Sequence, residues 1–197
     1  MSGAISIGSI SNHIVIGGNP KAFAPTDIAG LGGWYAARRE TAYANNDGVG
    51  TATDWGPQAN NLSALGDVRP LYITNVINGQ PVFRFDGTDD FLEGTSLAGI
   101  TDWSQSAFTV FLVARLAAVA EEDLFVDGAT GAGHMLLMVV SAPPSVIRGH
   151  AWRGAGDANA RDGATTISTA TNYLIAQRVT STQIEVHLNG SVDGGPT

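Results

Sequence analysis

The chain has 197 residues, a length typical of one β-rich domain and sufficient to bury an apolar core without crosslinks. Ten basic and eighteen acidic residues give a formal net charge of −8, which argues against nucleic acid and anionic membranes as partners. The sequence has no cysteine, so we expect neither disulfides nor thiol chemistry. Abundant glycine and a charged fraction of only 14% favour a turn-rich β protein.

Residues 1–20 alternate small and apolar residues, with isoleucine at positions 5, 7, 10, 14 and 16. This pattern predicts one or two short strands of weakly specified register. Two interpretations stay open: an N-terminal arm that docks on a neighbouring subunit, or a first strand of the same domain. A basic start followed by a long apolar run is missing, so we expect no secretory signal peptide. The apolar run at 135–140 is much shorter than the ~20 residues that span a bilayer, so we expect no membrane insertion.

The first half of the domain contains few regular elements. Residues 25–30 predict a single capped helical turn that ends at a glycine. A strand is expected through Trp34 and Tyr35. Residues 45–67 are rich in Asn, Asp and Gly and predict a long loop, which is either functional or a solvated crossover between two sheets.

Alternating apolar residues predict the strands of the second half. They are expected at residues 82–85, 108–116, 134–140, 146–152, 173–179 and 183–188. The strand at 108–116 is apolar on both faces, since Phe111 and Val113 lie opposite the main apolar row, and this pattern predicts a central, covered strand. Side chains expected to be buried between two sheets are Phe83, Phe85, Phe108, Val110, Leu112, Ile184 and Val186.

The dipeptides between these strands indicate tight turns. Asp-Gly occurs five times and Asn-Gly twice, and both tolerate the positive φ of hairpin turns. Sustained helical periodicity, internal repeats and low-complexity blocks are absent from the sequence. We therefore expect an all-β chain with an arm or strand at residues 1–20 and one domain at residues 21–197.

The segment from Asn78 to Leu92, NGQPVFRFDGTDDFL, together with the PTDIAGL entry at residues 25–31, resembles concanavalin A-like domains of the laminin-G type. The resemblance covers about residues 25–190 and implies a two-sheet antiparallel jelly-roll sandwich. Such domains are mostly binding or structural modules, and many occur in the virion proteins of tailed phages. Related domains carry one or two further strands after the last Asn-Gly turn, so we expect the closing strand to be absent, to be disordered beyond residue 197, or to be supplied by a neighbour.

Some glycosidases of this fold place carboxylates on alternate residues of one strand, where they act as nucleophile and general acid. Here Glu121, Asp123, Phe125 and Asp127 would share a face, with an apolar residue where the second glutamate belongs. A solvated turn leading into a strand is the alternative, and we expect no catalytic residues.

Two binding sites are candidates. Asp86, Asp89 and Asp90 offer the carboxylate oxygens that Ca²⁺ prefers, although aspartates also gather in turns because they accept backbone N–H bonds. Trp55, Trp103 and Trp152 lie in or beside Asn, Asp and Gly-rich stretches, where an exposed ring would suit stacking on a sugar. Alternatively, these rings cap the ends of the core.

The sequence thus favours a non-enzymatic structural protein of a phage-like virion: a capsid decoration, fibre or tail component. Its expected partners are other virion proteins, further copies of itself and a host-surface glycan. The alternatives are a secreted glycoside hydrolase and a free-standing lectin.

Overall fold

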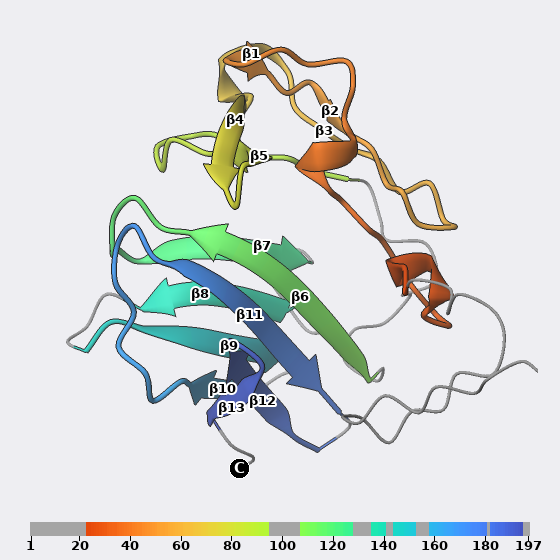
Figure 1. The fold of residues 1–197 in the computed structure, drawn as a ribbon. Helices are drawn as coiled ribbons and strands as arrows, with labels where there is room; N and C mark the ends of the chain where they lie inside the picture. The colour runs from red at the N-terminus through yellow and green to blue at the C-terminus, as the bar shows by residue number, and fades with distance from the viewer. Residues whose placement is uncertain are drawn as a thin grey trace, which may run out of the picture.

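The computed structural model describes residues 23–94, 107–127, 135–140, 144–152, 158–180 and 182–194, which form an all-β protein. Figure 1 shows two parts: a lobe that carries β1 to β5, and a two-layer sandwich that carries β6 to β13. The helices of the described chain are three single 3-10 turns, η1 (Pro25–Asp27), η2 (Ala37–Arg39) and η3 (Gly66–Val68). No helix in these ranges has the length and apolarity that crossing a bilayer requires.

The lobe contains two small antiparallel sheets. One has the order β1-β4-β5, with β1 at Asp47–Gly48, β4 at Leu71–Ile77 and β5 at Gln80–Arg84. The other pairs β2 (Thr51–Ala52) with β3 (Leu62–Ser63). Asn78 and Gly79 connect β4 to β5 with φ values of 51° and 73°, as a two-residue hairpin turn requires.

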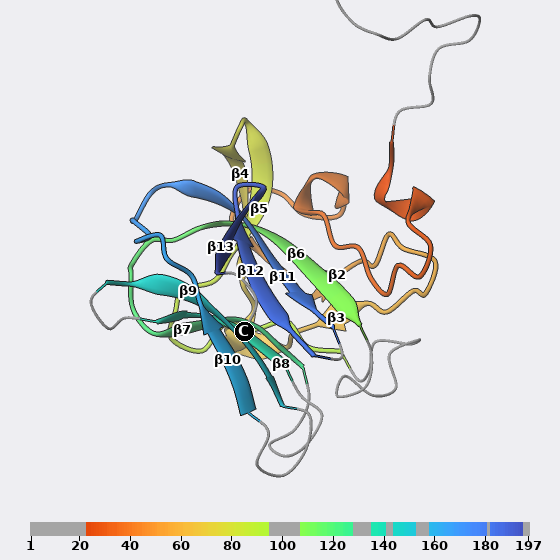
Figure 2. The same cartoon turned by 90° about the horizontal axis from the view of Figure 1, so that it is seen from below.

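The sandwich packs two four-stranded antiparallel sheets face to face (Figure 2). The front sheet has the order β13-β12-β11-β6, with β6 at Phe108–Arg115, β11 at Asn172–Val179, β12 at Ile184–Leu188 and β13 at Ser191–Gly194. The back sheet has the order β10-β9-β8-β7, with β7 at Glu122–Asp127, β8 at Met135–Val140, β9 at Val146–Trp152 and β10 at Ala158–Asp162.

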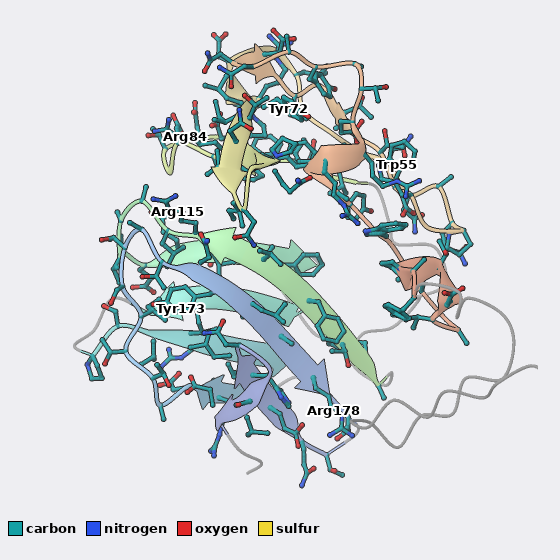
Figure 3. The ribbon with its side chains drawn as sticks, viewed as in Figure 1. Trp55, Tyr72, Arg84, Arg115, Tyr173 and Arg178 are labelled. Atoms are coloured by element: carbon teal, nitrogen blue, oxygen red, sulfur yellow. The ribbon has the colours of Figure 1, made fainter. Side chains whose placement is uncertain are left out.

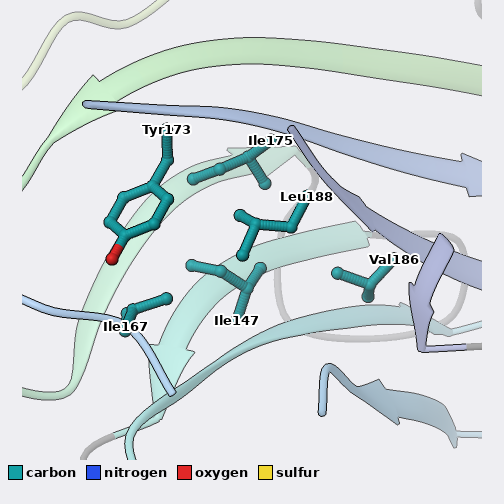
Figure 4. Close-up of a cluster of buried hydrophobic side chains, with 6 residues drawn as sticks. All are labelled: Ile147, Ile167, Tyr173, Ile175, Val186 and Leu188. Atoms are coloured by element: carbon teal, nitrogen blue, oxygen red, sulfur yellow. The ribbon is translucent and has the colours of Figure 1, made fainter. Parts of the chain in front are cut away.

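The core lies between β9 of the back sheet and β11 and β12 of the front sheet. Figure 4 shows its main cluster, which consists of Ile147, Ile167, Tyr173, Ile175, Val186 and Leu188, all at most 7% exposed. Gln177 is also fully buried, and its Nε2 donates a hydrogen bond across the sandwich to the His150 carbonyl at 3.1 Å. Gly149 makes room for this side chain, because a Cβ there would lie 3.1 Å from the Gln177 amide carbon.

At the edge formed by β10 and β13, the backbones of the two strands lie close together and close the sandwich. The Asp193 carboxylate accepts hydrogen bonds from the backbone N–H and the hydroxyl of Thr165, and its carbonyl accepts from Ala164 N–H. A Cβ on Gly194 would lie only 2.5 Å from the Asp162 carbonyl oxygen. Glycine at this position therefore lets β13 close against β10.

The opposite edge, formed by β6 and β7, is less closed. Among the described strands, β6 has one neighbour, β11, and β7 has one neighbour, β8. The four side chains of β6 that point between the sheets are only half-buried: Phe108, Val110, Leu112 and Ala114. Their counterparts on β11 and β12 are buried.

Most predicted strands are confirmed within a residue or two, namely β5, β6, β8, β9, β11 and β12, and so is the turn at η1. Ile184 and Val186 are buried as expected. The strand expected through Trp34 and Tyr35 is reduced to a single bridge between Tyr35 and Asp54. Residues 1–20 lie outside the described residues.

Four expectations are wrong. Phe108, Val110 and Leu112 were expected to be buried but are only half-buried, because β6 lies at an edge of its sheet. β5 pairs with β4 in the lobe, so Phe83 is half-buried there and Phe85, beyond the strand, is 47% exposed. β6 is an edge strand among the described strands, because it pairs only with β11, and its outer face is uncovered, since Phe111 and Val113 are exposed. A closing strand does follow the last Asn-Gly turn, since β13 pairs with β12.

Candidate functional site

The outer face of the front sheet carries an exposed apolar band. The register places Phe111 beside Ala176 and Val113 beside Leu174, on β6 and β11. Phe111 is 67% exposed, Val113 59% and Leu174 42%. The same row continues across β12 and β13 through His187 to Val192, which is also exposed. We call Phe111, Val113, Leu174 and Val192 the apolar band. Figure 1 shows β6 and β11 side by side on this outer face.

A shallow hollow of about 250 Å³ lies at one end of the apolar band. Its lining is mostly apolar and consists of Thr109, Phe111, Leu174, Ala176, Arg178, His187 and Gly190. Among its polar members, Arg178 (labelled in Figure 3) forms an ion pair with Glu185 at 2.9 Å. The Nε2 of His187 lies 3.2 Å from the same carboxylate. Arg178 first, and His187 second, hold the pKa of the Glu185 carboxyl below its usual value.

The three aspartates after β5 do come together. One carboxylate oxygen from each of Asp86, Asp89 and Asp90 lies within 4.8 Å of the others. The Asp86 carboxylate accepts the backbone N–H of Thr88 at 2.8 Å, and the Asp90 carboxylate accepts that of Asp86 at 2.8 Å. The Thr88 bond is the main reason why the pKa of Asp86 is lowered. These contacts are those of an Asx turn, and Ca²⁺ binding at this cluster stays a prediction.

Trp55 stacks on an arginine, and sugar binding at its ring stays a prediction. The Arg39 guanidinium lies 4.5 Å from the centroid of its ring and 4.8 Å from that of Trp34, as in a cation–π stack. Among the described residues, no acceptor reaches the buried Nε1–H of Trp55. Figure 3 places Trp55 in the lobe, away from β6 and β11. Trp103 and the side chain of Trp152 lie outside the described part of the chain.

The loops around Trp55 are held by a buried carboxylate. The sequence analysis did not predict this role. The Asp54 carboxylate accepts backbone N–H bonds from Trp34, Gly56 and Asn60, at 2.7 to 2.9 Å. Burial, and then the charge of Asp54, raise the pKa of Tyr35 to about 12. The Glu40 carboxylate likewise accepts hydrogen bonds from the backbone N–H and the hydroxyl of Thr53. These carboxylates hold the loops together. The only sign of this role in the sequence is the high content of Asn, Asp and Gly in the loops.

The acidic strand β7 does not present the expected row of carboxylates. A register shift between Asp123 and Phe125 interrupts its pairing with β8. Both Leu124 and Phe125 pack against the core, whereas Asp123 and Glu121 are exposed. The expected alignment of Glu121, Asp123 and Phe125 on one face is therefore wrong, because the bulge changes the phase of the strand. The side chain of Asp127 lies outside the described residues.

The apolar band could have been found from the alternation in residues 108–116. The sequence showed that Phe111 and Val113 are apolar and face away from the core row. It did not show that the layer over them is missing, because strand order depends on long-range pairing. Comparison of the chain with family models, curated proteins and solved structures finds no significant match.

Proposed function

We propose that this chain is a non-enzymatic binding and assembly module. The observation that carries the proposal is the apolar band: three of its large side chains are more than half exposed on a regular sheet face. Soluble proteins rarely leave contiguous apolar surface uncovered unless it contacts a partner. Because the rest of the chain is strongly acidic, an uncharged face is the place where two copies can approach without repulsion.

The setting that we propose is a phage-like virion, in which the protein is a capsid decoration, fibre or tail component. We also infer that the fold is a concanavalin A-like jelly roll. Two facing antiparallel sheets, with a front sheet assembled from β6 and the later strands β11 to β13, support this inference. The resemblance at residues 78–92 supports the virion setting, and other virion proteins and further copies of the chain are the proposed partners.

The geometry of β7 supports a non-enzymatic role. A retaining glycosidase needs two carboxyl groups about 5–5.5 Å apart across the scissile bond. The bulge in β7 turns Phe125 into the core and leaves Asp123 exposed beside the strand edge. A secreted glycoside hydrolase is the function that this arrangement favours least.

The proposal is tested by two measurements on the full chain. Mass spectrometry of purified virions should find the protein in the particle, and β-glucan substrates should not be cleaved. Glu121→Gln and Asp123→Asn should leave particle incorporation unchanged. Polysaccharide cleavage that either substitution removes, or a protein that never joins a particle or an oligomer, would contradict the proposal.

The hollow at the end of the apolar band favours a second candidate, glycan binding. An exposed Phe111 ring beside the ion-paired Arg178 and Glu185 offers an apolar surface next to polar groups, the combination that a sugar ring needs. Glycan-array binding that Arg178→Met weakens, while the protein stays folded and monomeric, would favour a free-standing lectin over an assembly module.

A further inference from the structure

Three residues of the lobe form a cation–π cluster: Trp34, Arg39 and Trp55. Tyr35 and Asp54 form an antiparallel bridge, so the residues beside them, Trp34 and Trp55, lie opposite each other. The backbone N–H of Trp55 donates a hydrogen bond to the Trp34 carbonyl at 2.8 Å. The Arg39 guanidinium of η2 lies over both rings, 4.8 Å from the centroid of Trp34 and 4.5 Å from that of Trp55. One cation therefore contacts two aromatic side chains.

Buried carboxylates hold the backbone around this cluster. Asp54 is 6% exposed, and its carboxylate accepts the backbone N–H of Trp34 at 2.8 Å. Glu40, which follows Arg39 in the chain, is also buried, and its carboxylate accepts the backbone N–H of Thr53 at 2.7 Å. The segments that carry the rings and the arginine are thus fixed by bonds that do not involve the guanidinium. A group held in this way is preorganised, so little ordering is needed when it binds a ligand.

The guanidinium of Arg39 has no hydrogen-bond acceptor and no carboxylate partner among the described residues. Arg148 and Arg178, in contrast, each bind a carboxylate. Stacking occupies the faces of a guanidinium and leaves the donors at its edge free to bind. The buried indole Nε1–H of Trp55 likewise meets no acceptor in the described part of the chain. The cluster therefore holds several donors and nothing that accepts from them.

The surroundings of this cluster favour an anion. Arg38, beside Arg39 on η2, is also exposed and has no ion pair with any described residue. Two adjacent unpaired cations are a local positive site in a chain whose formal net charge is −8. The fork of an arginine binds a planar carboxylate through two parallel hydrogen bonds. The two half-buried indole rings offer apolar surface beside that fork, which suits the C–H face of a sugar ring.

We propose that Arg39, stacked on Trp34 and Trp55, binds the carboxylate of an acidic sugar, such as a hexuronic acid in a glycan. The carboxylate accepts hydrogen bonds from the edge of the guanidinium, and the sugar ring packs on the accessible part of an indole. This inference rests on the proposed glycan partner and names the class of sugar. It places that sugar in the lobe, and not at the hollow beside Phe111.

Isothermal titration of the full chain with tetragalacturonate and with its methyl ester tests the proposal without any variant. The ester keeps the sugar rings but removes their charge, so it should bind roughly tenfold more weakly than the acid. Added salt should weaken binding of the acid more than binding of the ester. No detectable binding of the acid, or equal binding of acid and ester, would overturn the proposal. Inorganic phosphate or a tetraglutamate peptide that binds as tightly as the acid would overturn the choice of a sugar as the ligand.

Matched variants locate the site. Arg39→Gln should weaken binding of the acid roughly tenfold, and Arg39→Lys should also weaken it, because an ammonium group cannot form two parallel bonds. The control Arg84→Gln removes the same charge from an exposed arginine elsewhere in the lobe (Figure 3) and should leave the affinity unchanged. Equal losses in Arg39→Gln and Arg84→Gln would contradict a site at Arg39.

One further comparison separates this inference from the proposed function. Phe111→Lys changes the apolar band, so it should leave binding of the acid unchanged. A chain that binds the acid through Arg39 but never assembles supports this inference and contradicts the assembly role. A chain whose binding of the acid is lost in Arg178→Met and kept in Arg39→Gln supports the hollow as the glycan site and overturns this inference.

Discussion

The two edges of the sandwich differ in how closely the two sheets pack there, although the same two sheets form both edges. At β10 and β13, Gly194 brings two backbones together and Asp193 binds Thr165 across the gap. At β6 and β7, the inward side chains are only half-buried, and the apolar band beside them is exposed. Among the described residues, the core is therefore more fully packed at the first edge than at the second. This difference is the reason why the proposed contact with a partner is assigned to the second side of the sandwich.

Loss of a core side chain gives the largest expected effect. Ile175 is fully buried between the sheets, so Ile175→Ala should lower the free energy of unfolding by about 2–5 kcal/mol. Phe108 packs on Ala151, Val179 and Ile184 but is only half-buried, so Phe108→Ala should cost less than the ~3–5 kcal/mol of a buried phenylalanine. Urea titrations of the native protein and the two variants, all at the same protein concentration, measure both. A Phe108→Ala cost as large as that of a fully buried phenylalanine would show that the β6 edge is already closed.

Backbone crowding at the closed edge gives the next effect. In Gly194→Ala, the new Cβ would lie 2.5 Å from the Asp162 carbonyl oxygen, so β13 must move away from β10. We expect a loss of about 1–3 kcal/mol of unfolding free energy, as for other overpacked sites. The control is Gly50→Ala, where the nearest atom is 3.9 Å from the new Cβ and little change is expected. Equal, small effects of both substitutions on thermal unfolding would remove the evidence for close packing at β10 and β13.

The ion pair on the back sheet predicts a smaller, pH-dependent effect. Arg148 binds Asp162 through two bonds, of 2.5 and 2.9 Å, and holds the pKa of that carboxyl below its usual value. A lowered pKa means that the unfolded chain takes up a proton first, so this stabilisation is present at neutral pH and is lost as pH falls through the folded-state pKa. Both side chains are partly exposed, so Asp162→Asn should cost only about 0.5–1 kcal/mol at pH 7.

The same substitution should have almost no effect at a pH below the folded-state pKa of Asp162, where the native carboxyl is also protonated. Denaturant titrations of the native protein and of Asp162→Asn at neutral and at strongly acidic pH measure the difference. A cost that does not shrink with acidity would mean that the carboxylate contributes through packing and not through its charge.

Sequence reasoning could predict the sandwich strands but not their neighbours. Alternation located β9, β11 and β12, because each has one face in the core and the signal is local. It could not show that β5 belongs to the lobe or that β6 lies at an edge, since apolar residues look alike whether a layer covers them or not. For this reason Phe85, Phe111 and Val113 were expected to be covered and are exposed.

The sequence likewise predicted some features of the candidate sites and missed others. The aspartates after β5 were found because they lie close in sequence, and their contacts within one turn follow from that closeness. The carboxylate row on β7 failed because a bulge, invisible in the residue pattern, changed the phase of the strand. The stack of Arg39 on Trp55 joins residues from separate loops, and no local pattern predicts it.

Sedimentation velocity of the full chain and of two charged variants tests most directly whether the apolar band is the assembly surface. Phe111 is 67% exposed, so Phe111→Lys should keep the fold while placing a charge in the band. Leu65, 84% exposed in the lobe, gives the matched control Leu65→Lys. We predict that the native chain and Leu65→Lys sediment as oligomers and that Phe111→Lys sediments as a folded monomer. Oligomers that survive Phe111→Lys unchanged, or a native chain that is monomeric at every concentration, would contradict this account.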